Sequence, residues 1–291
     1  MVVPMAAGGP ADFVARTVAE KMREKLNATV IVENKPGANG AIGGQMVAAA
    51  APDGKTLLLA TSGLLTITPL LEQKSTFNPA TELTPITTVV VNGTALIVRA
   101  DHPANSVADL VAMAKQGKRI TLGSAGFGNI LHLYVELLKD VTRTDIQHVP
   151  YRGVAPAMTD ALSGNIDGLF ADLPASLPQI RGGKMKALGM VGETRSKAAP
   201  EIPTIAEQGY PGVTGASWFG LFGPAKMDTK VASDIAAKVG EILRDSEIVA
   251  KFEAVGAAPT PVTPQEFAQR IEKDRKGWAA VIQKNNIRLE N

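Results

Sequence analysis

Hydrophobic residues in the first part of the chain recur at two spacings, one typical of helices and one of short buried strands. Val14, Val18 and Met22 repeat at every fourth position, which predicts an amphipathic helix over Phe13–Leu26. The short apolar run Leu57–Ala60 is followed by Thr-Ser-Gly, a pattern that predicts a buried strand ending in a turn. Helical and strand patterns therefore alternate from the start of the chain.

The same alternation continues to the C-terminus. The predicted strands are the end of a strand at Met1–Pro4, then Val30–Val32, Leu57–Ala60, Leu96–Val98, Ile120–Leu122, His148–Pro150 and Ile166–Phe170. The predicted helices are Phe13–Leu26, Ile42–Ala51, Val107–Gln116, Ile130–Leu138, Ala155–Leu162, Lys230–Arg244 and Pro264–Lys284. This order indicates βαβ units and a mostly parallel sheet, so the fold class is α/β. The length of 291 residues favours two domains.

Two of the strand-to-helix connections share a glycine-rich sequence. Val2–Gly8 and Ile120–Gly126 each run from an apolar strand through an Ala-Gly turn towards a helix. A helix N-terminus behind glycines presents unpaired N–H groups and the positive end of a dipole, which suits a carboxylate or phosphate. A single turn of this kind is explained equally well by tight backbone geometry, and Asp12 by helix capping. The repetition favours anion binding by two matched lobes.

Composition and charge narrow the functional class. Hydrophobic residues make up 45% of the chain and charged residues 20%, as in an ordinary globular protein. The 30 basic and 28 acidic groups nearly balance, and no basic run is interleaved with aromatics, which argues against nucleic-acid binding. The chain has no cysteine, which excludes disulfides and thiol catalysis and suits an oxidising compartment.

Enzyme and metal motifs are incomplete. Gly126–Leu131 lacks the last glycine of a dinucleotide-binding fingerprint, and Leu122 stands where a nucleophile elbow around Ser124 needs a glycine. The histidines have no Cys or Glu at the spacing of metal ligands; they are His102, His132 and His148. The sequence therefore predicts no cofactor, no metal site and no catalytic residue.

Several polar residues near predicted strand ends are candidates for ligand contacts. Arg152 follows a strand within Tyr151–Gly153 and is equally consistent with a carboxylate partner or a solvated cation. Asp172 follows an apolar strand, where it would accept a hydrogen bond from a hydroxyl or ammonium group, or cap a helix. His132, one turn into a helix, would contact ligand or satisfy the core. Trp218 is interpreted as part of a strand that crosses between domains.

These segments carry a family resemblance over essentially the whole chain. The matching motifs are Val3–Asp12 with Ala15-Arg16, Val32–Gly40, Ala51–Gly54, Gly123–Gly126, His132-Leu133, Val149–Gly153 with Pro156-Ala157, Pro203–Gly209 and Ser217–Gly220. Together they resemble the Bug family, the TctC-like solute-binding proteins of tripartite tricarboxylate transporters. The resemblance implies a periplasmic-binding-protein or Venus-flytrap fold, with two lobes joined by two crossover strands. Lobe 1 would comprise residues 1–98 and 219–291, and lobe 2 residues 99–218.

The resemblance also implies a function and a site. The protein would be a non-catalytic, monomeric periplasmic receptor that closes around a small carboxylate and delivers it to a membrane permease. Di- and tricarboxylates, aromatic acids and acidic amino acids all fit a site formed by backbone amides. The implied ligand-binding residues are Ala7, Gly8, Gly9, Asp12, Ser62, Ser124, Ala125, Gly126, Gly128, Asn129, His132, Tyr151, Arg152, Gly153 and Asp172.

Two alternatives stay open beside transport. A sensor that presents its closed form to a signalling kinase would have the same sequence features, and an enzyme on the same fold would need a nucleophile and base that the sequence does not reveal. The first residues read as the end of a strand without a lead-in, so we expect a longer precursor and infer export from the family alone.

Overall fold

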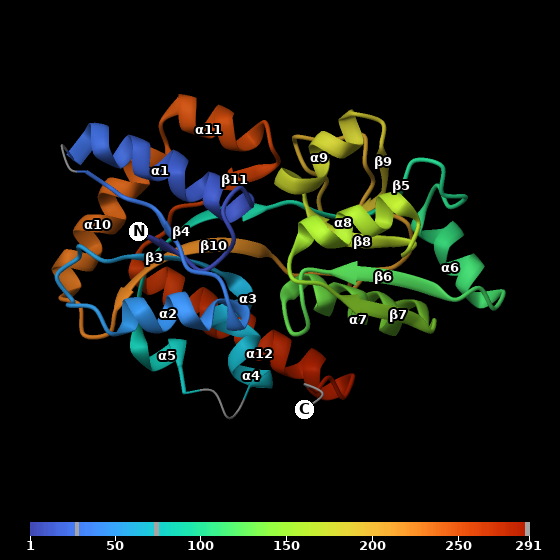
Figure 1. Cartoon of the computed structure of the whole chain (residues 1–291), viewed down its shortest axis with the longest axis horizontal. Helices are drawn as coiled ribbons and strands as arrows, with labels where there is room; N and C mark the ends of the chain where they lie inside the picture. The colour runs from blue at the N-terminus through green and yellow to red at the C-terminus, as the bar shows by residue number, and fades with distance from the viewer. Residues whose placement is uncertain (27–28, 73–75, 289–291) are drawn as a thin grey trace. The chain divides into compact units, whose positions relative to one another are not determined.

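The computed structural model describes residues 1–26, 29–72 and 76–288 of the chain, which forms two compact units (Figure 1). Unit 1 comprises Met1–Val91 and Trp218–Ala280. Unit 2 comprises Asn92–Ser217 and Val281–Asn291. Each unit has a sheet of its own covered by helices, so each is an α/β layer structure.

Unit 1 is built on a six-stranded sheet with the order β11-β4-β10-β3-β1-β2. Its strands are β1 (Val2–Val3), β2 (Glu33–Asn34), β3 (Leu58–Thr61), β4 (Leu83–Asn92), β10 (Ser217–Pro224) and β11 (Ala257–Pro259). Its helices are α1 (Pro10–Leu26), the 3₁₀ helix η1 (Ala38–Gly40), α2 (Ala41–Ala48), α3 (Ser62–Thr66), α4 (Thr68–Leu71), α5 (Pro79–Glu82), α10 (Thr229–Leu243), α11 (Ser246–Glu253) and most of α12 (Pro264–Lys284). Strand β1 is parallel to β2 and β3, whereas β10 runs antiparallel to β3.

The core of unit 1 accounts for the apolar residue at every fourth position of α1. Val14 and Val18 of α1 are fully buried against Leu59 of β3 and Leu221 of β10, together with Val239 of α10. Helices α1 and α11 lie on one side of the strands and α2 on the other in Figure 1. The apolar stripe of α1 therefore faces the sheet, as the periodicity requires.

Unit 2 is built on a five-stranded sheet with the order β7-β6-β8-β5-β9. Its strands are β5 (Thr94–Arg99), β6 (Ile120–Ser124), β7 (Ile146–Pro150), β8 (Gly168–Asp172) and β9 (Met185–Met190). Its helices are α6 (Val107–Lys115), α7 (Ile130–Thr142), α8 (Val154–Ser163) and α9 (Leu173–Arg181). Strand β6 is parallel to β7 and β8, and β5 is antiparallel to β8 and β9. The carboxyl ends of β6, β7 and β8 therefore meet at one edge, beside the start of β5.

Some predicted elements need correction. Helix α1 begins at Pro10, three residues before the predicted start, because proline is favoured at the first helical position. The strand predicted at Val30–Val32 is wrong, since β2 pairs with β1 at Glu33–Asn34. Where the sequence predicts a turn after β3, the structure has the short helix α3. Both sheets are mixed rather than mostly parallel, because β10 and β5 enter them antiparallel.

The division into units differs from the predicted lobe boundaries. Residues 92–98, expected in lobe 1, belong to unit 2 because β5 pairs with β8 and β9. Residues 281–288 also belong to unit 2, where Lys284 Nζ lies 2.6 Å from an Asp140 carboxylate oxygen of α7. Ser217 is the last residue of the long unit 2 segment, and Trp218 begins the return to unit 1.

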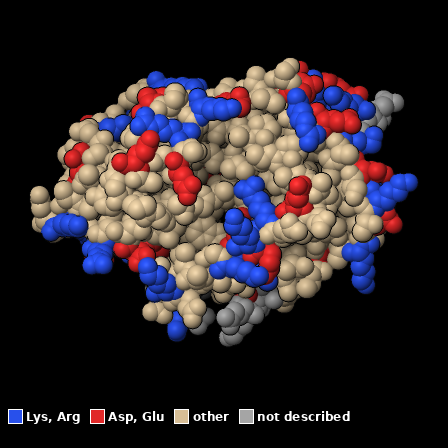
Figure 2. Space-filling view, turned by 180° about the vertical axis from the view of Figure 1, so that it is seen from behind, with Lys and Arg blue, Asp and Glu red and all other residues tan. Residues whose placement is uncertain are grey.

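The surface carries a balanced distribution of charge. Figure 2 shows basic and acidic side chains interspersed over the visible face. This agrees with the formal net charge of +2. Within the described residues, no helix is both long enough and apolar enough to cross a membrane.

Candidate functional site

The first glycine-rich turn joins β1 to α1 and is held by the side chain of Asp12. Gly8 has φ of 80°, in the left-handed region that favours glycine. Its N–H donates to Asp12 Oδ2 at 2.9 Å, and Arg16 Nε donates to the same oxygen at 3.0 Å. Ala7 is exposed and Gly9 half-buried. The Gly8 amide is thus occupied within the turn.

Asp12 is the centre of a small polar network in unit 1. Arg16 Nη2 donates to Asn34 Oδ1 at 3.1 Å, and Asn34 Nδ2 donates to the Met5 carbonyl at 3.1 Å. Burial by itself would raise the pKa of Asp12, but hydrogen bonds from Arg16 and the Gly8 amide outweigh it and hold the pKa below its usual value. Asp12 is therefore ionised at neutral pH and fixes the path of the turn.

Ser62 brings a second polar group to the same edge of this sheet. It is the first residue of α3 and follows β3, which is parallel to β1, so both connections leave the sheet at its carboxyl edge. Within the described part of the chain, Ser62 Oγ and Asp12 Oδ1 are buried without a hydrogen-bond partner. Buried polar atoms normally have partners. The Ser62 hydroxyl can donate to an anion or a water, whereas the ionised Asp12 Oδ1 can only accept a hydrogen bond.

The second glycine-rich turn joins β6 to α7 in unit 2. Gly126 and Gly128 have φ of 140° and 75°, both in the left-handed region. Asn129 Oδ1 accepts the His132 N–H at 3.0 Å and so caps α7, while His132 Nδ1 accepts the Gly128 N–H at 3.2 Å. Ser124 is fully buried, and its hydroxyl lies 2.8 Å from the Gly126 carbonyl oxygen.

The third predicted segment, Tyr151–Gly153, follows β7 beside that turn. The Tyr151 N–H donates to the Ser124 carbonyl at 3.1 Å, and the Tyr151 hydroxyl donates to Asp160 of α8 at 2.7 Å. Burial and the neighbouring Asp160 raise the pKa of Tyr151 to about 12. Arg152 is exposed and forms no ion pair with any described residue. Its guanidinium is thus available to an anion.

Asp172, at the end of β8, has its two carboxylate oxygens on two different hydroxyls. Thr94 Oγ1 donates to Oδ1 at 2.6 Å, and Ser217 Oγ donates to Oδ2 at 3.0 Å. The residue is the N-cap of α9 by position, as the capping interpretation expected, but its side chain accepts no hydrogen bond from that helix. Burial raises its pKa to about 6, which the two hydroxyls only partly offset.

Sequence reasoning missed three residues that complete this edge of unit 2. They are His148, whose Nε2 lies 2.7 Å from Ser124 Oγ, and the two hydroxyl donors to Asp172, Thr94 and Ser217. These pairs are 24, 78 and 45 positions apart in sequence. No local pattern signals such contacts.

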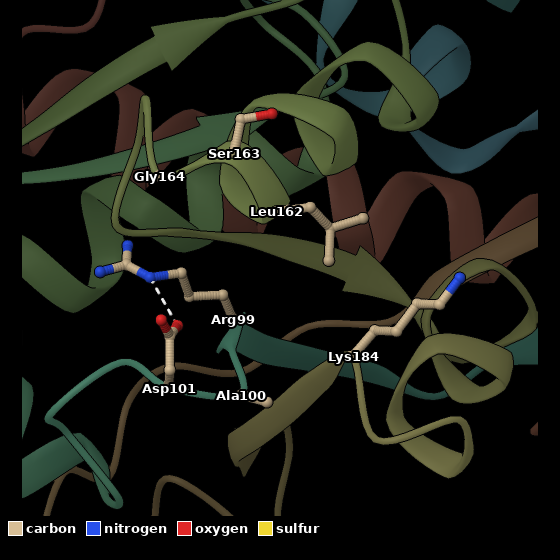
Figure 3. Close-up of a pocket in the computed structure, with 7 residues that line it drawn as sticks. All are labelled: Arg99, Ala100, Asp101, Leu162, Ser163, Gly164 and Lys184. Carbon is tan, nitrogen blue, oxygen red and sulfur yellow. Dashed lines mark ion pairs between the residues drawn. The ribbon is translucent and has the colours of Figure 1, made fainter.

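A surface depression of about 520 Å³ lies at the opposite edge of the same sheet (Figure 3). Its lining residues are Arg99, Ala100, Asp101, Leu162, Ser163, Gly164 and Lys184. Arg99 ends β5 and pairs in register with Met185 at the start of β9, so this edge is where β8 begins. Ligands of open α/β sheets bind at carboxyl ends, so this depression is separate from the candidate site.

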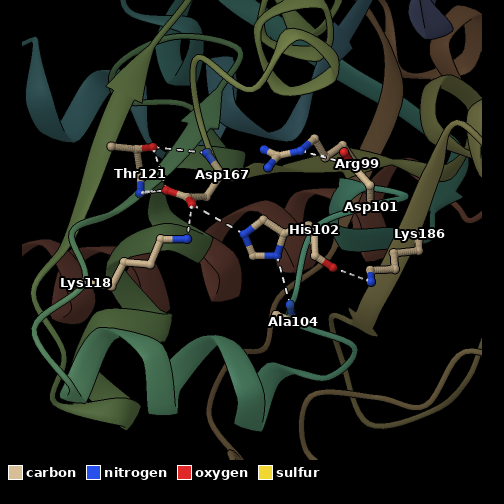
Figure 4. Close-up of polar contacts among 8 residues, drawn as sticks. All are labelled: Arg99, Asp101, His102, Ala104, Lys118, Thr121, Asp167 and Lys186. Atoms are coloured by element: carbon tan, nitrogen blue, oxygen red, sulfur yellow. Dashed lines mark hydrogen bonds and ion pairs between the residues drawn. The ribbon is translucent and has the colours of Figure 1, made fainter.

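The polar contacts at that opposite edge account for His102 (Figure 4). Its Nδ1 accepts the Ala104 N–H at 3.2 Å, and its Nε2 lies 3.4 Å from Asp167 Oδ1. Asp167 Oδ2 also accepts the Thr121 N–H at 2.9 Å, and Lys186 Nζ donates to the His102 carbonyl at 2.6 Å. These contacts tie the His102 segment to β6 and β9.

Across residues 1–26, 29–72 and 76–288, no group of three or more His, Asp or Glu side chains could hold an ion. Both glycine-rich turns present backbone amides at the first turn of a helix of at least 13 residues. The chemistry that this geometry supports is hydrogen bonding to an anion.

Comparisons with known proteins agree with this chemistry. Residues 14–287 match the model of the "Tripartite tricarboxylate transporter family receptor". The chain is similar to the periplasmic binding protein BugD, with a TM-score of 0.90 and 33% identity over 99% of this chain and 97% of that one.

Two similar structures hold carboxylates. Rpa4515 of R. palustris, solved with adipate, has a TM-score of 0.94 and 30% identity, covering 99% of this chain and 97% of that one. MatC of Rhodopseudomonas palustris, with bound malate, has a TM-score of 0.88 and 28% identity over 97% of each chain. The chain therefore belongs to the tripartite tricarboxylate transporter receptor family and has the two-lobed α/β fold of its periplasmic solute-binding proteins.

Proposed function

We propose that this receptor captures a small carboxylate between its two units and delivers it to a membrane permease. The observation that carries the proposal is the glycine-rich turn at a helix N-terminus in each unit, before α1 in unit 1 and before α7 in unit 2. Amides and dipole at a helix N-terminus stabilise a carboxylate by about 0.3–1 kcal/mol each at an exposed site, and by up to about 2 kcal/mol in a partly buried one. Two such ends would act additively on a ligand with two acidic groups.

Closure of the units around the ligand supplies the rest of the mechanism. Removing water from the carboxylate lowers the local dielectric constant and strengthens each charge-assisted hydrogen bond. A ligand that binds the closed form better shifts the population towards it, and the permease would recognise that form. No bond of the ligand is made or broken.

The ligand class follows from the groups that the turns offer. A carboxylate held by backbone amides leaves the rest of the molecule to the pocket wall, for which we propose Ser62, Arg152 and Asp172. The bound adipate and malate of the two relatives favour an aliphatic dicarboxylate among the di- and tricarboxylates, aromatic acids and acidic amino acids that fit such a site.

A thermal-shift screen with adipate, malate, an aromatic acid and an acidic amino acid tests the proposal. A ligand at 100 times its dissociation constant adds about 2.7 kcal/mol of stability, so the midpoint rises by several degrees. The dimethyl ester of the best ligand is the matched control, because it keeps the carbon chain and loses both charges. Absence of a shift with every acid, or an equal shift with the ester, would refute carboxylate binding.

Further measurements separate the finer parts of the proposal. Small-angle scattering should show a smaller radius of gyration with ligand and the mass of a monomer in both states. Mass spectrometry should return the ligand unaltered, whereas a new product would establish an enzyme. Loss of uptake of the labelled ligand in cells lacking the gene supports delivery to a permease, and unchanged uptake favours a sensor that signals to a kinase.

A further inference from the structure

Two histidines that are 16 positions apart in sequence stack face to face beneath the glycine-rich turn of unit 2. The rings of His132 and His148 have centroids 3.9 Å apart and planes inclined by 26°. Phe127, at the tip of the turn, lies 4.4 Å from the His132 ring. Burial is the main cause that lowers the pKa of His148 to about 3. Its imidazole is therefore neutral at physiological pH, and one of its two nitrogens carries hydrogen.

The hydrogen bonds of Ser124 show which ring nitrogen of His148 carries the hydrogen. Ser124 Oγ lies 2.8 Å from the Gly126 carbonyl oxygen and 2.7 Å from His148 Nε2. A carbonyl oxygen only accepts, so the single hydroxyl hydrogen goes to Gly126. His148 Nε2 must then donate to Ser124 Oγ, which also receives the Gly126 N–H at 3.3 Å. His148 thus orients Ser124, and Ser124 holds both backbone groups of Gly126.

The hydrogen bonds of His132 define its tautomer in the same way. His132 Nδ1 accepts the Gly128 N–H at 3.2 Å, so Nδ1 carries no hydrogen. Its Nε2 lies 3.6 Å from Glu136 Oε1, and Glu136 also pairs with Lys139 at 2.9 Å. Burial would raise the pKa of Glu136, but its contacts with His132 and Lys139 hold the pKa below its usual value. The neutral form of His132 therefore carries its hydrogen on Nε2, facing a carboxylate.

We infer that His148 and His132 are positioning residues that set the backbone of the ligand-binding turn through Gly126 and Gly128. The inference deepens the proposed function and rests on it for the role of the turn. The N–H groups of Gly126 and Gly128 are already bonded within the protein, to Ser124 Oγ and His132 Nδ1. The amides of Ala125 and Asn129 donate to no residue in the described part of the chain, and they are left for a ligand carboxylate.

This hydrogen-bond pattern also separates the Ser124–His148 contact from a catalytic dyad. A general base needs an unprotonated nitrogen facing the nucleophile, whereas His148 Nε2 donates to Ser124. The Ser124 side chain is also fully buried, and its hydrogen is used on Gly126. The contact therefore positions the turn and does not activate the serine.

The first test is made on the unliganded chain. With ¹⁵N-labelled histidine, His148 should appear as the neutral Nε2–H tautomer at pH 7.5, and His132 Nδ1 should appear as the acceptor of the Gly128 N–H. Amide exchange at Gly126 should accelerate about tenfold in His148→Leu, and at Gly128 in His132→Leu, because each amide loses its buried acceptor or the group that orients it. An Nδ1–H tautomer on either ring, or unchanged exchange in both variants, overturns the inference.

The second test uses adipate and malate as probes, with conservative variants to separate positioning from stability. Gln at position 148 keeps a donor at the site of Nε2, and Asn at position 132 keeps an acceptor at the site of Nδ1. We expect about tenfold weaker binding in His148→Leu and His132→Leu, and recovery to within threefold in His148→Gln and His132→Asn. His102→Leu is the matched control, since it removes a buried imidazole from the opposite edge of the same unit and should leave both affinity and exchange at the turn unchanged.

The outcomes distinguish this inference from the proposed function. If neither acid binds the parent chain while tautomers and exchange behave as expected, the histidines position the turn and the ligand assignment is wrong. If the acids bind and the leucine variants keep full affinity although their exchange is altered, the positioning role in binding is refuted.

Discussion

Replacing Asp172 by Asn should change how the stability of the protein depends on pH. Asp172 is 8% exposed, and its carboxyl group has two hydroxyl donors and no ion pair with any described residue. Burial raises its pKa from 3.8 to about 6. The folded chain therefore binds this proton more tightly than the unfolded chain does. The resulting stabilisation is fully present below pH 3.8 and is lost as the pH rises through 6.

The size of the effect follows from the difference between the two pKa values. About two pKa units at 1.36 kcal/mol each give close to 3 kcal/mol in total, of which about 2–3 kcal/mol lies between pH 4 and pH 8. Asparagine has the same shape and no titration. The free energy of unfolding of the parent chain, minus that of Asp172→Asn, should thus fall by about 2–3 kcal/mol from pH 4 to pH 8.

Urea unfolding at several pH values, followed by far-ultraviolet circular dichroism, measures this difference. Both tryptophans, Trp218 and Trp278, belong to unit 1, so their fluorescence would miss an event in unit 2. Asp101→Asn is the control, because its side chain is 82% exposed and surface ion pairs contribute little. Parallel curves for the parent chain and Asp172→Asn would refute the reasoning, since they require an ordinary pKa in the folded state.

Two further substitutions test the site and the core. Arg152→Ala should weaken carboxylate binding while changing the free energy of unfolding by less than about 0.5 kcal/mol, because the side chain is exposed. Unchanged affinity in a calorimetric titration would show that Arg152 is not part of the site. Gly220→Ala should destabilise unit 1 by about 1–3 kcal/mol, because the added methyl group would collide with the Phe267 ring. Tryptophan fluorescence during urea unfolding measures this change. A midpoint equal to that of the parent chain would show that the ring moves aside at no cost in stability.

The helices were predicted best where apolar spacing is regular and no proline intervenes. Helix α12 spans Pro264–Lys284 as predicted, and α10 differs from its prediction by one residue at each end. Helix α9 was missed because it contains Pro178 inside and another proline in its first turn, which a sequence pattern reads as breakers. Strand β2 was misplaced because its pairing with β1, and not its own apolar residues, determines where it lies.

The candidate site was predictable only in its backbone. Glycines before a helix are a local signal, so both turns were found, whereas the cap formed by Asn129 was not predicted. The hydrogen bonds of Ser124 with His148 and of Asp172 with Ser217 join positions 24 and 45 residues apart. Such partners are determined by strand order and register, which no short window of sequence contains.

The turn that precedes α1 is held by Asp12, Arg16 and Asn34, all in unit 1. The side chains that hold this turn all belong to unit 1, so substitutions confined to unit 2 leave its hydrogen bonds in place. Exposed positions of unit 2 can therefore change without loss of the backbone conformation of this turn.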